Sequence, residues 1–342
     1  MHLSLLLLYL ISLTLSTTQP EANSPYIGLS LSSRTITLAS HDGTDTIVLA
    51  QWQANLAYRT WFAEAISQHL VHEAVDATVV VCEVFNQAEE ILNIKLGEEK
   101  AYITAVSVPF PISTRRLEIE MLAAVEGLSL WDDRTGVPLA ILETRQILWG
   151  AYGLSQSQGL GVEGIVNESG EGAGAGVVVN VEINWVCSGI QVLGVEEGVV
   201  WVIGEDVWLD LGWRKDDGGE YGESGLTLRQ DATWVTNVEG RFERFFAQYF
   251  VSTPSMREGD KYASEHLRMV TFTGDAPAHA FALVRGALGR LLANYPWVVF
   301  REDFEPDEIS AIGAAMLGKV LAEEETRYET DYVVDMTGFQ DT

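Results

Sequence analysis

The fold is decided by residues Val177–Trp213, which read VVVNVEINWVCSGIQVLGVEEGVVWVIGEDVWLDLGW. Every second residue of the first part is apolar: Val177, Val179, Val181, Ile183, Trp185 and Cys187. This alternation predicts a strand with one buried face, because successive side chains of a strand point to opposite sides. A turn at 196–198, a returning strand over 199–203 and a third strand over 206–211 should follow. The stretch is therefore expected to form a β-meander, whose polar side chains either belong to the core or line a ligand site.

The same plan, strand hairpins followed by alternating strands and helices, is predicted in both halves of the chain. In the first half the patterns predict strands over 26–40, 46–53, 77–84, 101–109 and 162–166, and helices over 58–72, 113–126 and 138–152. In the second half, beyond the meander, they predict helices over 240–250, 277–294 and 307–324, and strands over 268–273 and 297–300. We expect an α/β protein of two lobes, residues 23–172 and 173–325, each a mixed sheet flanked by helices, and a tail over 326–342.

Composition limits the classes of partner. Of the 342 residues 47% are hydrophobic and 20% charged, which is typical of a folded globular protein. The 21 Lys and Arg against 49 Asp and Glu give a net charge of −28, which argues against nucleic acid and anionic membranes as partners. Cys82 and Cys187 lie in Val-rich runs and are expected to be buried thiols. A single bridge between them stays open if the compartment is oxidising.

The N-terminus predicts a route through the secretory pathway. Residues 3–15 are almost all apolar, a length that fits a signal peptide better than a membrane span of about 20 residues. Residues 1–22 are therefore predicted to be a signal peptide, and the protein to be secreted or in the endoplasmic reticulum. An uncleaved anchor, or a buried element of a cytoplasmic protein, is the alternative. No other segment is expected to enter a membrane.

Several separate segments, taken in order, resemble one known family. They are VTFTGDAPA at 270–278, PDEISAIGAA at 306–315, IVNESG at 165–170, the strand and helix over 105–128, and the hairpin outline over 26–40. Together they resemble the ATPase domain of the DnaK-type heat-shock chaperones, within the actin and sugar-kinase superfamily. The resemblance implies a two-lobed, actin-like ATPase fold with a nucleotide cleft between the lobes.

The phosphate-binding hairpins of that family are altered in this chain. At the first hairpin, a metal-organising Asp and a Gly-Thr-Thr turn are replaced by Ser30 and by Ser32-Ser33-Arg34. The second, DLGGGTxD, falls on NVEINWVC at 180–187, so Asn180 and Glu182 stand at degenerate phosphate positions. Glycine is needed there because backbone N–H groups must approach phosphate without a Cβ in the way. The resemblance therefore implies that Mg-ATP hydrolysis is lost.

Candidate site residues remain in three places. Glu168 matches the family's Glu that orients the attacking water, or it is a solvated turn carboxylate; Asn167 begins an N-glycosylation sequon. Gly274 and Asp275 either line a nucleotide-binding surface at a helix N-terminus, or form a plain loop in which Asp275 caps the helix. Gly313 either contacts a nucleotide or allows close helix packing.

Metal and carbohydrate sites have weaker support. The acidic loop over 216–223 fits no EF-hand pattern, and His69 and His72 lack a third ligand, so no metal site is expected. The ten tryptophans are consistent with core packing or with a surface that stacks on sugars.

These observations predict a degenerate chaperone-like ATPase domain, more an interaction protein than an enzyme. It would bind or scaffold an unknown protein partner or small molecule, without the family's peptide-binding domain. One alternative is a residual nucleotide-binding protein or slow ATPase, with ATP as its cofactor. The other is a secreted carbohydrate-binding protein.

Overall fold

The structure, a computed structural model, describes most of the chain. The described residues are 25–67, 77–96, 103–108, 140–154, 176–196, 199–213, 228–250 and 266–332. The predicted signal peptide, the predicted strand over 162–166, the predicted helix over 113–126 and the candidates Asn167 and Glu168 lie outside them. So do His69, His72 and the acidic loop over 216–223.

The first sheet has five strands in the order β3-β2-β1-β4-β5. Its antiparallel part consists of β1 (Tyr26–Leu31), β2 (Thr35–His41) and β3 (Thr46–Gln53). Strands β4 (Ile103–Ser107) and β5 (Ala140–Leu142) then extend the sheet in parallel beside β1. Helices α2 (Leu56–Ser67) and α3 (Ala77–Leu96) share an apolar core with this sheet.

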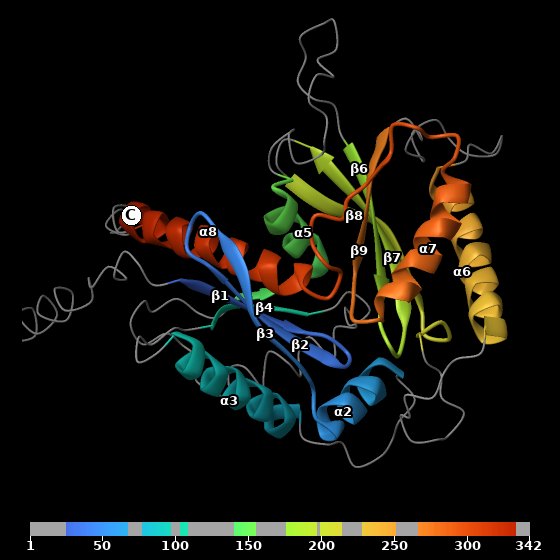
Figure 1. Cartoon of the computed structure of the whole chain (residues 1–342). Coiled ribbons are helices and arrows are strands. Elements are labelled where there is room, and N and C mark those ends of the chain that lie inside the picture. Colours follow the sequence, from blue (N-terminus) through green and yellow to red (C-terminus); the bar gives the residue numbers. More distant parts are fainter. Residues whose placement is uncertain are drawn as a thin grey trace, which may run out of the picture.

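The second sheet repeats this arrangement, with five strands in the order β10-β9-β6-β7-β8. Its antiparallel part is the meander β6 (Gly176–Ile183), β7 (Ser188–Glu196) and β8 (Val199–Trp208). Strands β9 (Leu267–Thr273) and β10 (Val299–Phe300) continue in parallel beside β6. Helices α6 (Leu228–Tyr249) and α7 (Ala278–Leu291) pack on one face (Figure 1). The prediction of an α/β protein with two mixed sheets flanked by helices is confirmed.

Two helices connect the sheets on their other faces: α5 (Thr144–Tyr152) and α8 (Ile309–Tyr332). Helix α8 packs on the first sheet so closely that a Cβ on Gly28 would lie 2.2 Å from the carbonyl oxygen of Ala311. Helix α5 packs on the second sheet through Leu148, which shares a core cluster with Val178. The two helices also touch each other, since a Cβ on Gly313 would lie 2.4 Å from the oxygen of Ile147.

The predicted strand over 77–84 is wrong, because this segment begins the long helix α3. Its buried residues recur at helical spacing: Val80, Val81, Val84, Phe85, Ala88 and Leu92. The run of valines suggested a strand because β-branched residues favour one. The buried positions that follow, up to Leu92, carry the helical period, and burial on one helix face overrides the weak propensity of the valines.

Several element boundaries also differ from the prediction. The helix predicted over 240–250 begins at Leu228 as α6, and the helix predicted over 307–324 continues to Tyr332 as α8. The predicted helix over 138–152 begins only at Thr144, because Ala140–Leu142 pairs with β4 as strand β5. Glu143 and Gln146 form a capping box that starts the helix there.

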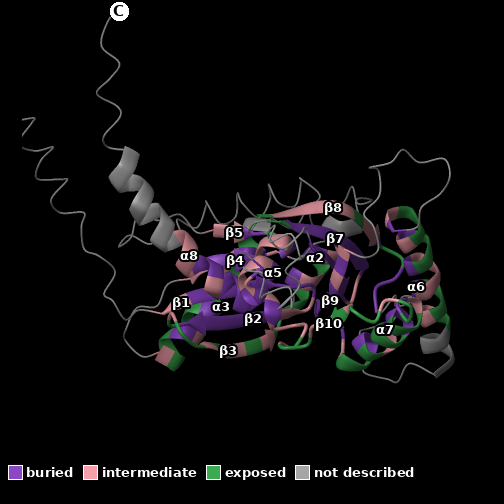
Figure 2. Ribbon diagram, turned by 90° about the horizontal axis from the view of Figure 1, so that it is seen from above, coloured by how far each residue is buried: buried purple, intermediate pink, exposed green. Residues whose placement is uncertain are grey.

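The second sheet contains a three-stranded meander as predicted, but its strands are divided differently. A turn that was not predicted separates β6 from β7, and the strands predicted over 199–203 and 206–211 belong to the single strand β8. Strand β6 ends at Ile183, and the N–H of Asn184 donates to the oxygen of Cys187 at 2.9 Å, which closes a turn. The predicted third strand is part of β8, which runs without a break to Trp208. The central strands β1 and β6 are buried almost throughout, and Figure 2 shows the buried residues gathered in the middle of the molecule. Among the described helices none is both long and apolar enough to cross a membrane.

Replacing Gly28 with alanine should destabilise the protein strongly. The new Cβ would collide with backbone atoms of α8, at 2.2 Å from Ala311 and 2.3 Å from Ala315, and backbone cannot move aside as a side chain can. We expect a loss of about 3 kcal/mol in the free energy of unfolding, measured with urea. The control is Gly289→Ala on α7, where a Cβ meets nothing within 4 Å, and a gain of about 0.5–1 kcal/mol is expected. Equal effects of the two substitutions would contradict the packing described.

Candidate functional site

Turns from both sheets meet at one place in the molecule. The first joins β1 to β2 at Ser32–Arg34, the second joins β6 to β7 at Asn184–Cys187, and the third joins β9 to α7 at Gly274–Pro277. Hydrogen bonds connect all three turns, as described below. Residues that the sequence singled out separately, Ser33 and Asp275, are thereby brought into direct contact.

The carboxylate of Asp275 lies at the centre of this contact and is only 5% exposed. It accepts hydrogen bonds from the hydroxyl of Ser33 at 2.8 and 3.0 Å. It also accepts from the backbone N–H groups of Arg34 and of Thr35, the latter at 3.0 Å. From the second sheet, the N–H of Trp185 lies 3.4 Å away. Donors from the first and second turns therefore converge on one carboxylate from the third.

This group of donors has the form of an anion-binding site. Successive N–H groups in a tight turn point to the same side and together attract a negative group. The side chains of the first two turns also touch, since the guanidinium of Arg34 stacks 4.3 Å from the centre of the Trp185 ring. The hydroxyl of Ser33 also accepts from the N–H of Trp185 at 3.3 Å, which joins the first two turns directly. The anion that fills the site is the protein's own carboxylate.

Burial raises the pKa of Asp275 above its ordinary value, because an ionised carboxylate loses its water. The hydrogen bonds from Ser33, Arg34, Thr35 and Trp185 act in the opposite direction and offset part of that effect. Loss of hydration is therefore the larger contribution. The donors are what make an ionised carboxylate tolerable at this depth.

Gly274 holds the third turn in place. Its φ is +114°, a conformation that favours glycine, and a Cβ there would lie 2.3 Å from the oxygen of Ile183. The N–H of Ala276 donates to that same oxygen at 3.1 Å, and the N–H of Asp275 donates to the side chain of Asn184 at 3.2 Å. The alternative in which Asp275 caps the following helix is wrong: the N-cap of α7 is Pro277, and Asp275 turns toward the first sheet instead.

Glu182 is buried on the face of the second sheet that meets α5. Its carboxylate accepts from the amide of Asn184 at 2.9 Å and from the hydroxyls of Thr144 and Thr273, both at 3.3 Å. Thr144 is the first residue of α5. The predicted degenerate phosphate position is thus part of a buried polar network that connects β6, β9 and α5.

Asn180 extends the same network along β6. It is fully buried, accepts from the hydroxyl of Thr271 at 3.0 Å, and donates to the hydroxyl of Thr273 at 3.0 Å. Among the remaining sequence candidates, Ser30 lies inside β1 opposite Thr37. The backbone N–H of Ser32 donates to the oxygen of Thr35 across the first turn, at 3.3 Å. Gly313 lies against α5, in the close helix packing that was one of its two interpretations.

The sequence did not reveal the partners of Asp275. Ser33 and Asp275 are 242 positions apart, and nothing local in either segment links them. Arg34, Thr35 and Trp185 contribute backbone N–H groups, which no residue type encodes. The one available signal was indirect: an Asp after a buried strand needs donors if it is buried too.

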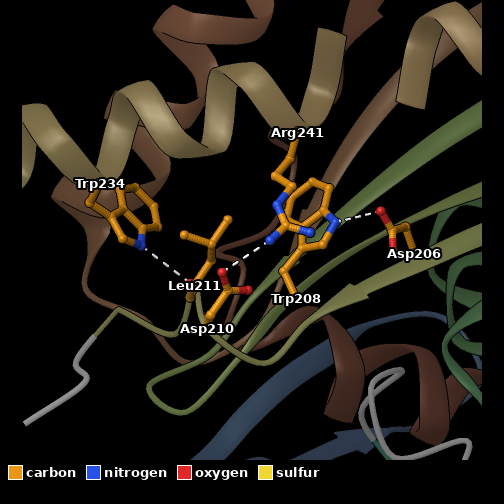
Figure 3. A network of polar contacts seen from close by, with 6 residues as sticks. All are labelled: Asp206, Trp208, Asp210, Leu211, Trp234 and Arg241. Atoms are coloured by element: carbon orange, nitrogen blue, oxygen red, sulfur yellow. Dashed lines mark hydrogen bonds and ion pairs between the residues drawn. The ribbon is translucent and has the colours of Figure 1, made fainter. Parts of the chain in front are cut away.

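Most described tryptophans are covered. Nine of the ten lie in described residues, and of these only Trp297 is exposed, at 42%. Figure 3 shows two of them near the end of β8: Trp234 of α6 donates to the oxygen of Leu211 at 3.2 Å, and Trp208 donates to Asp206 of the same strand at 2.7 Å. Arg241 adds an ion pair to Asp210 at 3.0 Å. These contacts give the two tryptophans a structural role.

The last groups singled out by the sequence are the two cysteines and the possible metal ligands. Cys187 and Cys82 are both free; Cys187 is fully buried, as predicted, and Cys82 is half-buried. In the described part of the chain, no group of three or more His, Cys, Asp or Glu side chains is arranged to hold a metal ion.

Removing the Asp275 carboxylate should cost more stability than removing an equally well bonded carboxylate at the surface. Asp275→Ala leaves buried donors of the first two turns without an acceptor, and we expect a loss of about 3 kcal/mol in the free energy of unfolding. Asp42 is the matched control, because it accepts from Thr44 and Asp45 in an exposed turn where water can replace it. Asp42→Ala should have a much smaller effect in the same urea titration. Similar losses would contradict the central role of Asp275.

The contributions of Asp275 and Asp42 to the free energy of unfolding should change in opposite directions with pH. The folded-state pKa of Asp275 is raised, so the folded protein binds its proton more tightly than the unfolded chain does. The unfolding free energy of wild type minus that of Asp275→Asn should therefore fall as pH rises from the ordinary value of 3.8 through the raised value. For Asp42→Asn the difference should fall as pH decreases, because hydrogen bonds from Asp45 and Thr44 lower the pKa of Asp42 to about 2. Slopes of the same sign would contradict this assignment.

Comparison with known proteins gives no family for this chain. A scan against protein-family models finds no match. A search of curated proteins finds none that matches. The function has to be inferred from the geometry of the three turns.

Proposed function

We propose that the protein is a degenerate relative of the DnaK-type chaperone ATPase domain, a binding or scaffolding protein that does not hydrolyse ATP. The fold supports this proposal. Both sheets have the same strand order, an antiparallel meander extended by two parallel strands, and α5 and α8 run between them. A two-lobed actin-like domain has this repeated plan. Of the segments that resemble the chaperones, three lie fully in the described residues: 26–40 forms β1 and β2, 270–278 joins β9 to α7, and 306–315 begins α8.

The main support for a loss of ATP hydrolysis is the position of Asp275. Its carboxylate accepts the hydrogen bonds that the first two turns donate. By the resemblance, these turns correspond to the hairpins that wrap phosphate in the active family. The N–H groups that would hold phosphate oxygens already hold an internal anion. A nucleotide phosphate would have to displace the carboxylate of Asp275. It would also meet a second buried carboxylate, that of Glu182 near the end of β6.

The metal chemistry of the family also lacks its ligands here. Ser30 stands where the resemblance places the metal-organising Asp, and it lies within strand β1. A Mg²⁺ ion prefers several oxygen ligands, usually including carboxylates and phosphates. Asp275 is hydrogen-bonded to the first turn, and Glu182 to threonines and an asparagine, so both buried carboxylates already have partners within the protein. We therefore expect no Mg-dependent hydrolysis.

The two alternative functions receive less support from the described residues. Residual nucleotide binding relied on Glu168, Gly274 and Asp275. Glu168 lies outside the described residues, and the other two are engaged in internal contacts where the three turns meet. A carbohydrate-binding surface relied on several exposed tryptophans, and within the described residues only Trp297 is exposed. The location in the secretory pathway, and the unidentified protein or small-molecule partner, stay predictions from the sequence.

Isothermal titration calorimetry with Mg-ATP tests the proposal. The full chain should show no binding up to about 1 mM ATP, a limit that corresponds to about −4 kcal/mol of binding free energy. An active DnaK-type chaperone, titrated in the same buffer, serves as the positive control. Phosphate release should also stay at the level of buffer alone. Binding of Mg-ATP by the wild-type chain with a micromolar Kd would overturn the proposal and favour the nucleotide-binding alternative.

A further inference from the structure

The turn between β6 and β7 inserts into the core of the other sheet. Cys187 is 0% exposed and belongs to the apolar cluster of the first sheet, with Tyr58, Phe62 and Val84. Val186 packs against the same cluster. Both residues lie between strands of the second sheet. This turn therefore stays buried only while the two sheets are held together.

The contacts of Asp275 lie directly beside this inserted turn. Trp185, which donates to Asp275, is the neighbour of Val186 in the chain. Asn184 links the same turn to the loop of Asp275, because its side chain accepts from the N–H of Asp275 at 3.2 Å. The N–H of Asn184 closes the turn by donating to Cys187. The turn also touches the first sheet directly, through the hydrogen bond from Trp185 to Ser33 and the stacking of Arg34 on the Trp185 ring. Ser33 and Arg34 both donate to Asp275 as well, so loss of the Asp275 carboxylate would weaken the positioning of these contacts too.

Other connections between the sheets, away from the three turns, run through the helices and the start of α8. Gly313 packs against Ile147 where α8 meets α5. Thr37 and Gln51 of the first sheet donate to Asp307 at 3.0 and 2.8 Å, just before α8. None of these contacts involves the residues of the inserted turn. Release of the contacts at the turns would therefore leave these connections between the sheets in place.

We propose that Asp275 is the latch of a conformational switch: its contacts hold the two sheets closed, and their release withdraws the 185–187 turn and exposes the Cys187 thiol. Burial raises the pKa of Cys187 well above its ordinary value, with the charges of Glu182 and Asp275 adding to the effect, so the closed form keeps the thiol protonated and unreactive. This proposal concerns the two sheets alone and does not depend on whether the chain binds a nucleotide.

Thiol labelling tests the latch. Cys82→Ser leaves Cys187 as the single cysteine of the full chain, and its reaction with a disulfide reagent such as DTNB is followed in native buffer. In this background labelling should be slow, and Asp275→Ala should accelerate it on the order of 100-fold, because local opening becomes that much more populated. Ser33→Ala, which removes one donor, should give an intermediate rate, roughly 10-fold above the parent. Asp42→Ala is the control and should leave the rate unchanged.

The denaturant dependence of labelling separates opening from unfolding. Opening of the interface exposes little surface, so the labelling rate should rise only weakly with urea, whereas labelling through global unfolding follows the full equilibrium m-value. Ser33→Ala keeps the test decisive if Asp275→Ala does not fold. The proposal is overturned if Cys187 in the folded variants reacts at the rate of the parent, or only with the full urea dependence of unfolding.

Discussion

The structure depends on the burial of one carboxylate between two sheets. A carboxylate removed from water costs several kcal/mol unless donors satisfy its oxygen atoms. For Asp275 the donors are a hydroxyl and two N–H groups of the first turn and one N–H group of the second. These donors belong to different sheets, so the carboxylate is satisfied only when both sheets are in place. Apolar contact brings the sheets together, and this polar contact selects one relative position.

The buried polar residues of β6 apply the same constraint inside the second sheet. Asn180 and Glu182 need partners, and they find them in the threonines of β9 and in Thr144 at the start of α5. A shift of β9 by one residue would turn its threonines to the other face and leave both groups unsatisfied. Buried polar networks of this kind specify an arrangement more sharply than apolar packing does, because a partly satisfied network is costly.

Local patterns in the sequence were enough for most elements and failed where distant contacts decide. The alternation along Val177–Ile183 and along the first hairpin predicted strands correctly, since period and burial agree there. The segment from Ala77 was misjudged because the valines favour a strand, whereas packing of one helix face on the first sheet decides the structure. The site was predicted as separate residues only. Contacts between Ser33 and Asp275 join chain segments that no local pattern relates.

The hydrogen bonds to Asp275 where the three turns meet determine what a ligand of this region must replace. A ligand that displaces the Asp275 carboxylate from between the turns must accept hydrogen bonds from its four donors instead. Each donor left buried and unpaired costs about 1–3 kcal/mol. A partner that binds the outer surface meets no such cost. By the proposal above, a ligand would reach the inner residues only after the contacts of Asp275 are released. In that case the apparent affinity of any inner ligand equals its affinity for the open form multiplied by the fraction of protein that is open. Binding at the turns and exposure of Cys187 would then be two measures of the same equilibrium.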